Sequence, residues 1–161
     1  MKILVLSDSH GDTADMVRVV ARHKDEVACI AFLGDYAKDV DTFAARFGKP
    51  VAAVAGNCDW TSKYPRDLVL DAAGKQIWMC HGDAFGVKSN YNKITSAAAA
   101  RRADICLFGH THEAVTFERN GILFMNPGSI SEPRGRTGRS YGIITIESGV
   151  CRGSIFLAAD F

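Results

Sequence analysis

The strongest constraint on the fold of this chain is a pattern that recurs five times: a short apolar run that ends directly at a polar turn. Four of the five histidines of the chain fall in these turns. The turns are Asp8-Ser9-His10, Gly34-Asp35, Gly56-Asn57-Cys58-Asp59, Cys80-His81-Gly82 and Gly109-His110-Thr111-His112. Short apolar runs bounded by turn residues predict buried strands. The sequence therefore predicts a sheet with Asp, Asn and His side chains gathered at one edge.

The first third of the chain alternates strand and helix patterns. We expect strands over Lys2–Leu6, 28–33 and 51–55, and helices over 13–23 and Asp39–Phe47. This β-α-β-α-β order predicts a parallel sheet with right-handed crossovers. His23 ends the first helix, and we expect it at the surface.

In the rest of the chain, strand patterns dominate. One helix is expected over 89–102, and Asn120-Gly121 and Ser148-Gly149 predict hairpin turns. The expected strands cover residues 68–70, 76–80, 104–108, 114–118, 122–125, 141–146 and 153–158. We interpret this part as a second, mostly antiparallel sheet. The predicted fold class is α/β, with two packed mixed sheets flanked by helices in a single domain over residues 1–161.

Composition excludes several functional classes. The 19 basic and 18 acidic residues give a net charge of +1, which offers no track for a nucleic acid. No apolar run approaches the roughly 18 residues of a membrane helix. The five cysteines form no CxxC pair, which argues against a zinc knuckle. Reduced thiols and the lack of an export signal predict a cytoplasmic protein.

The polar turns carry the chemistry of a metal site. Carboxylate and amide oxygens combined with imidazole nitrogens suit divalent Mn, Fe, Zn, Co or Ni. A carboxylate has two oxygens, so it can hold two ions about 3.5–4 Å apart. In open α/β sheets the ligand site lies beyond the carboxyl ends of the strands, where these turns are expected.

The order Asp-x-His, Gly-Asp, Gly-Asn-x-Asp, His-Gly and Gly-His-x-His resembles the calcineurin-like metallophosphoesterase superfamily. The short chain and the Gly-Asn-Cys-Asp variant are most similar to its small prokaryotic, YfcE-like phosphodiesterase branch. The resemblance runs from Lys2 to Ser129. It implies a metallophosphodiesterase with two divalent ions, Mn first among the candidates, that hydrolyses a small phosphoester. The oligomeric state is open, and a homo-oligomer is one of the options.

The resemblance also implies a role for seven residues. One ion would be held by Asp8, His10 and His112, and the other by Asn57, His81 and His110. Asp35 would bridge both ions, and a hydroxide shared between them would attack phosphorus. The resemblance marks as catalytic Asp35, Asn57 and His110.

One position departs from the family pattern. Many members have a histidine after the asparagine that is thought to protonate the leaving group, whereas this chain has Cys58. A thiol is a weak hydrogen-bond donor with an ordinary pKa of about 8.5. Either another group donates the proton, or the favoured leaving groups, such as aryl oxides, need little help.

Three other functions compete with the phosphodiesterase: a phosphomonoesterase or nucleotidase with the same metals, a non-catalytic scaffold of the same fold, and a nuclease. The scaffold predicts eroded ligands, but all seven positions are filled. Around the site, Asp59 is expected to be structural and residues 126–129 to form a structural turn below the metal loops. Residues 134–139 are either a solvated loop or a source of phosphate-binding arginines. Phe85 and Tyr91 either line the pocket or belong to the core.

Overall fold

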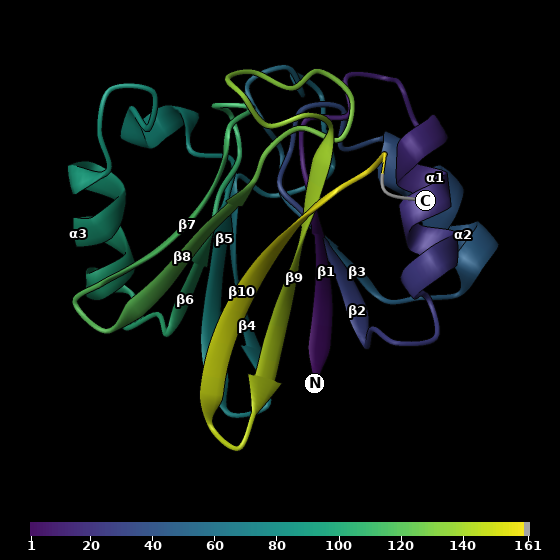
Figure 1. Ribbon diagram of the computed structural model, residues 1–161. Coiled ribbons are helices and arrows are strands. Elements are labelled where there is room, and N and C mark those ends of the chain that lie inside the picture. The colour runs from purple at the N-terminus through teal and green to yellow at the C-terminus, as the bar shows by residue number, and fades with distance from the viewer. Residues whose placement is uncertain (160–161) are drawn as a thin grey trace.

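The computed structural model describes residues 1–159, apart from the side chains of residues 42–44. Two five-stranded sheets pack face to face and are flanked by helices (Figure 1). This arrangement confirms the predicted α/β class with two mixed sheets. No helix in the described part of the chain combines the length and apolar character needed to cross a membrane.

The first sheet has the strand order β10-β9-β1-β2-β3. Its strands are β1 (Lys2–Leu6), β2 (Cys29–Phe32), β3 (Val51–Ala53), β9 (Ser140–Glu147) and β10 (Val150–Leu157). The three strands β1, β2 and β3 are parallel, as the alternation of strands and helices predicts. Strand β9 runs antiparallel to both β1 and β10.

The second sheet has the strand order β4-β5-β6-β8-β7. Its strands are β4 (Asp67–Ala72), β5 (Lys75–Cys80), β6 (Ile105–Leu107), β7 (Ala114–Arg119) and β8 (Ile122–Pro127). The inner pairs β5–β6 and β6–β8 are parallel, and the outer pairs are antiparallel.

The predicted membership of this sheet was wrong for the last two strands. Strands β9 and β10 join the first sheet, where β9 pairs with β1 and removes a free edge there. Apolar alternation identifies a strand but not its partner, because the partner depends on which edge is open in the folded chain.

Three apolar layers follow from the two-residue period of the strands. Leu4 and Leu6 of β1 face the helices α1 (Ala14–His23) and α2 (Asp39–Phe47). Ile3 and Val5 point the other way, into the layer between the sheets. Trp78 of β5 faces α3 (Asn92–Ala100) on the outer side of the second sheet.

Two details differ from the expectations for the helices. His23 is buried, because the last turn of α1 packs on β9, where His23 Nε2 lies 2.9 Å from the hydroxyl of Tyr141. Helix α3 begins at Asn92, because Ser89 and Asn90 instead donate backbone hydrogen bonds to the carbonyl of Gly86.

Candidate metal centre

All five polar turns lie at the same end of the two sheets. Asp8, Asp35 and Asn57 follow the parallel strands β1, β2 and β3. His81 follows β5, and the turn that carries His110 follows β6, which is parallel to β5. In Figure 1 the loops after these strands gather at the top of the molecule. The two parallel halves thus deliver their polar turns to one place.

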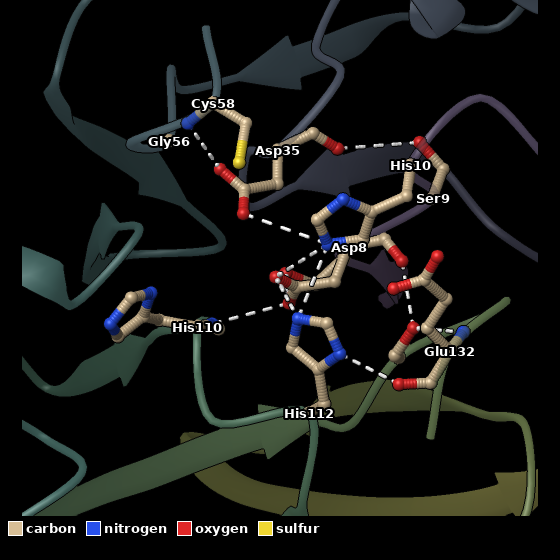
Figure 2. Close-up of polar contacts among 12 residues, drawn as sticks. Asp8, Ser9, His10, Asp35, Gly56, Cys58, His110, His112 and Glu132 are labelled. Carbon is tan, nitrogen blue, oxygen red and sulfur yellow. Dashed lines mark hydrogen bonds and ion pairs between the residues drawn. The ribbon is translucent and has the colours of Figure 1, made fainter. Parts of the chain in front are cut away.

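Four of the seven predicted ligands form a compact group, which we call the inner group. It consists of Asp8, His10, Asp35 and His112, whose ligand atoms all lie within 4.8 Å of one another. His112 Nε2 lies 3.2 Å from Asp8 Oδ1, and His10 Nε2 lies 3.6 Å from Asp35 Oδ2. Figure 2 shows both imidazoles directed at the carboxylates. This geometry can surround a cation.

His81 and His110 lie beside the inner group. His81 Nε2 is 3.4 Å from Asp35 Oδ1 and 3.2 Å from His110 Nδ1. The backbone N–H of His110 donates to Asp8 Oδ2 at 3.2 Å, while the His110 ring points away from Asp8 (Figure 2).

Asn57 is placed differently from the other six. It is exposed, and its amide nitrogen lies 3.4 Å from the sulfur of Cys58. The structure therefore brings six predicted residues together and leaves the seventh at the surface of the adjoining loop.

Two histidines are held in a defined orientation by backbone carbonyls. His81 Nδ1 lies 2.7 Å from the carbonyl oxygen of Leu33, and His112 Nδ1 lies 2.6 Å from that of Glu132. A carbonyl oxygen only accepts hydrogen bonds, so Nδ1 carries the hydrogen in both rings. In the neutral imidazole, Nε2 then has a free lone pair that faces the carboxylates. Metal-binding histidines are commonly oriented in this way.

The inner group fits a cation on electrostatic grounds. Asp8 Oδ1 is buried and has no hydrogen-bond partner within the described residues, although a buried carboxylate oxygen is costly to leave unpaired. Burial opposes the charging of His81, but hydrogen bonding to Asp35 and the charge of Asp8 outweigh it and raise the pKa of His81. Asp8 raises the pKa of His112 in the same way, against burial. The site therefore favours added positive charge, and its oxygen and imidazole donors suit a divalent metal.

The pKa of Asp35 is also set by burial acting against hydrogen bonds and neighbouring charge. Burial alone would raise its pKa, but the imidazole of His81 and the backbone N–H of Cys58 lower it well below the ordinary value. The Cys58 N–H donates to Asp35 Oδ1 at 2.9 Å. Asp35 is therefore a charged carboxylate placed between the inner group and His81.

The backbone of the site is strained. Positive φ angles, which are rare for residues other than glycine, occur at Asp8 (55°), His10 (46°), Asp35 (58°), Tyr36 (72°), His110 (70°) and His112 (60°). Such conformations cost about 1–3 kcal/mol each and persist only where the surroundings hold them. Their concentration at one end of the sheets is typical of a functional site.

Polar residues beneath the loops supply that support. Ser129 and Ser131 donate hydroxyl hydrogen bonds to the backbone carbonyl of Asp8, at 2.7 and 3.0 Å. The amide of Asn126 donates to the carbonyl of Gly109 at 2.8 Å and to the hydroxyl of Thr111 at 2.9 Å. Residues 126–129 thus lie beneath the metal loops, as predicted, although Asn126 and Pro127 still belong to strand β8. The contact of Ser131 was missed. The available signal was a polar cluster directly after the apolar run of β8.

Close approach explains two glycines of the motifs. A Cβ atom at Gly56 would overlap the carboxylate of Asp35, and one at Gly109 would overlap the hydroxyl of Ser7. The tight contact between adjacent loops thus depends on the absence of side chains at these positions.

In the loop after β3, the two residues that follow Asn57 have different environments. Asp59 accepts the backbone N–H groups of Gly56 and Ala37, both at 2.9 Å, and is therefore structural, as predicted. Cys58 exposes its thiol, and partial burial together with Asp35 raises the pKa of this thiol to about 11. Cys58 is accordingly a weaker acid than a free cysteine.

The segments flanking the site divide between core and surface. Phe85 packs edge-on against Trp78 and Tyr91 stacks on Phe117, so both rings pack against the core. Each also lines a cavity, Phe85 together with His81 and Tyr91 together with Thr111, so both interpretations apply. In residues 134–139, Arg139 pairs with Asp15 at 3.1 Å. Arg134 instead borders a cavity of about 340 Å³ that reaches Thr111. Only Arg134 of these two is placed near the candidate centre.

Comparisons with known proteins agree with this geometry. Residues 1–149 match the model of the calcineurin-like phosphoesterase superfamily domain. The probable metallophosphoesterase YsnB of Bacillus subtilis is 35% identical over 148 residues, which cover 92% of this chain and 86% of YsnB. The phosphodiesterase YfcE of Escherichia coli K12 is 28% identical, over 89% of this chain and 87% of YfcE.

A solved structure shares the whole fold. The crystal structure of a predicted phosphoesterase from Streptococcus pneumoniae TIGR4 matches with a TM-score of 0.83 and 30% identity. The match covers 98% of this chain and 89% of the other.

Proposed function

This chain belongs to the calcineurin-like phosphoesterase superfamily, and on that premise we propose that it is a metal-dependent phosphodiesterase with two divalent ions. The observation that supports it most directly is the inner group, in which the unpaired Oδ1 of Asp8 faces the imidazoles of His10 and His112. A single buried carboxylate could be structural, but Asp8 lies near three imidazoles, and two of these, His81 and His112, are oriented by backbone carbonyls as metal-binding histidines commonly are.

Seven residues would hold the ions. We assign Asp8, His10 and His112 to one ion, Asn57, His81 and His110 to the other, and Asp35 to both. The contacts of Asp35 support its bridging assignment, because Oδ2 faces His10 and Oδ1 faces His81. We propose Mn as the metal, with Fe, Ni, Zn and Co as alternatives of similar ligand preference.

Bound ions of this kind supply Lewis acidity to phosphoryl oxygens and acidify the water that serves as nucleophile. The chain itself supplies negative charge through Asp8 and Asp35 and holds the Nε2 atoms of His81 and His112 inward. Asp35 is further fixed by the N–H of Cys58. As the family resemblance implies, the proposed catalytic residues are Asp35, Asn57 and His110.

Space on two sides of the centre favours a diester over a monoester. A cavity of about 430 Å³ is lined in part by Cys58, which follows Asn57 in the sequence. Another of about 340 Å³ is lined in part by Thr111, which stands between His110 and His112 in the sequence. A phosphodiester has two substituents, so it can use both cavities, whereas a monoester leaves one empty. A phosphomonoesterase with the same ions is the alternative.

Hydrolysis of two chromogenic esters tests this choice. Metal-free protein reconstituted with Mn²⁺ is expected to cleave bis(p-nitrophenyl) phosphate faster than p-nitrophenyl phosphate, and not at all with chelator. A preference for the monoester would move the assignment to a phosphatase. Bound metal without turnover of either ester would favour a non-catalytic scaffold of the same fold.

We further propose that residues 1–161 form one domain that acts on a small phosphoester in the cytoplasm, and that copies of the chain associate. Sedimentation of the purified protein at several concentrations tests the association. A single species with the mass of one chain at every concentration would contradict it.

A further inference from the structure

Trp60 is the most exposed large apolar side chain in the described part of the chain, at 92%. The other large apolar residues with exposed surface lie at the N-terminus or on the edge strands β4 and β10. Trp60 instead lies on the loop after β3, three residues beyond Asn57. Isolated surface apolar residues are common, so exposure alone carries no argument.

The surroundings of Trp60 give it a specific position. It lines the same 430 Å³ cavity as Cys58, and a second hollow of about 480 Å³ that contains Asn57. The first hollow thus borders residues that adjoin the inner group, and the second borders Asn57, one of the seven predicted ligands. Cys58 contacts Asp35 through its backbone, and Tyr36 lies with its ring 5.7 Å from that of His10. A group bound against Trp60 would thus lie next to the reacting phosphate.

The loop around Trp60 is held in place before any ligand binds. Asp59 ties its start to the loop after β2 through Ala37. Asp41 ties its end, because it accepts the hydroxyl of Tyr64 at 2.6 Å and pairs with Lys63 at 2.9 Å. A fixed frame around a projecting indole is typical of a prepared binding surface.

The charges that line the cavity favour a small ligand over a protein partner. Two lysines and two aspartates line it together with Trp60, whereas the centre of a protein interface is depleted of charge. Lys63 pairs with Asp41, and Asp59 accepts backbone N–H groups. Lys38 lies over the ring of Tyr36 at 5.3 Å and has no carboxylate partner among the described residues, so it is the cation left for an anionic ligand. The cavity volume lies within the range of about 300–1,000 Å³ usual for small ligands.

We propose that Trp60 and the cavity beside Cys58 bind a planar aromatic substituent of the phosphodiester, a nucleobase or a simple aryl ring, by stacking on the indole. This inference rests on the proposed function for the identity of the substrate. The ring lies on Trp60, Lys38 faces the negative charge of the ester, and the phosphate reaches the centre past Cys58. Trp60 is thus a residue that determines specificity and takes no part in the chemical step.

Fluorescence of metal-free protein tests the stacking without any turnover. Trp78 is fully buried, so a change caused by a ligand reports on Trp60. Adenosine is expected to quench the emission with saturation, and ribose is expected to have no effect. Quenching by both adenosine and benzyl alcohol would identify a general aryl site, and quenching by adenosine alone a nucleobase site. In Trp60→Phe the change should vanish.

Kinetics of the Mn²⁺-loaded enzyme give an independent measurement. Trp60→Ala should raise KM for bis(p-nitrophenyl) phosphate about tenfold and change kcat less, since stacking is lost in the bound state. Trp60→Phe keeps a ring and should retain most of the affinity. Phe156→Ala, which removes an aromatic ring exposed elsewhere, is the control and should leave KM unchanged.

The two proposals can fail separately. Active wild-type enzyme with no quenching and an unchanged KM in Trp60→Ala would overturn the stacking and leave the phosphodiesterase intact. Saturable quenching in a protein that hydrolyses no ester would support the aromatic site and refute the function.

Discussion

Two loops at the same end of the molecule have opposite physical character. The loop after β1 is buried: Ser7, Asp8 and Ser9 have no exposed surface, and Asp8 is held through both its carboxylate and its carbonyl. The loop after β3 is tied to its neighbours through Cys58, Asp59 and Tyr64, yet Asn57 and Trp60 are exposed. The first loop faces a cluster of imidazoles and the second faces cavities.

The difference separates two tasks within one site. Binding a small ion requires donors held within fractions of an ångström, which burial and strain supply. Accepting an organic substituent requires open surface near those donors. The first loop suits the chemistry, and the second suits recognition of the substrate.

The largest effect is expected at Asp35, which follows β2 and contacts both loops, through His10 of the first and Cys58 of the second. Asp35→Asn keeps the shape but removes the charge that faces both His10 and His81, so metal should bind more weakly. We expect kcat/KM to fall by about 10²–10³-fold or more, as for the loss of a main electrostatic group. Calorimetric titration with Mn²⁺ and diester hydrolysis measure the two effects. Wild-type turnover in this variant would refute the bridging role.

Removing support from beneath the buried loops should have the next largest effect. Asn126→Ala leaves the Gly109 carbonyl without its buried donor, which costs about 1–3 kcal/mol of stability. Displacement of the neighbouring histidines should lower activity about 10–100-fold. Urea unfolding and kcat/KM check both values. Asn92→Ala, at the exposed first residue of α3, is the control. Equal losses in the two variants would contradict the supporting role of Asn126.

The stability of the metal-free protein should depend on pH through the buried histidines of the site. The raised pKa values of His81 and His112 mean that their protonation stabilises the folded state below about pH 6.5. This contribution disappears as the pH rises through the folded-state pKa values. Burial lowers the pKa values of His110 and His23, which act in the opposite direction. The part of Tm that depends on His81 and His112 should therefore be lost above pH 6.5 in chelator, and a variant with both changed to Gln should not show this loss.

Bound Mn²⁺ is the control for this titration. Metal replaces the protons, so Tm of the loaded protein should hold or increase over the same interval. Parallel curves with and without metal would show that these histidines do not bind it.

The smallest effect is expected on the exposed loop, at Cys58. Cys58→Ala should change cleavage of aryl esters only a few-fold, since a thiol of such low acidity gives little help to the leaving group. Cys58→His should improve the cleavage of alkyl esters more than that of aryl esters, because the adjoining cavity has room for an imidazole. A series of esters with leaving groups of graded pKa measures this. No gain in Cys58→His would show that another group already serves as the acid.

Most of the elements and most of the site were predictable because they depend on local patterns. The strands β1, β5 and β8 and the helix α2 follow directly from runs of apolar residues and their stop signals. The placement of β9 was not predictable, since pairing with β1 depends on contacts more than 130 residues apart in the chain. His23 was misplaced for the same reason, because its burial depends on Tyr141 of β9.

The sequence by itself determined which polar turns meet at one end of the sheets, because turns directly after apolar runs emerge at the carboxyl ends of strands. Only the tertiary structure decided which of these residues lie together and which lie apart. It placed Asp8, His10, Asp35 and His112 in one compact group, left Asn57 outside, and exposed Trp60 beside the centre. Burial, strain and ring orientation arise from contacts between the two sheets, and no local pattern in the chain records those contacts.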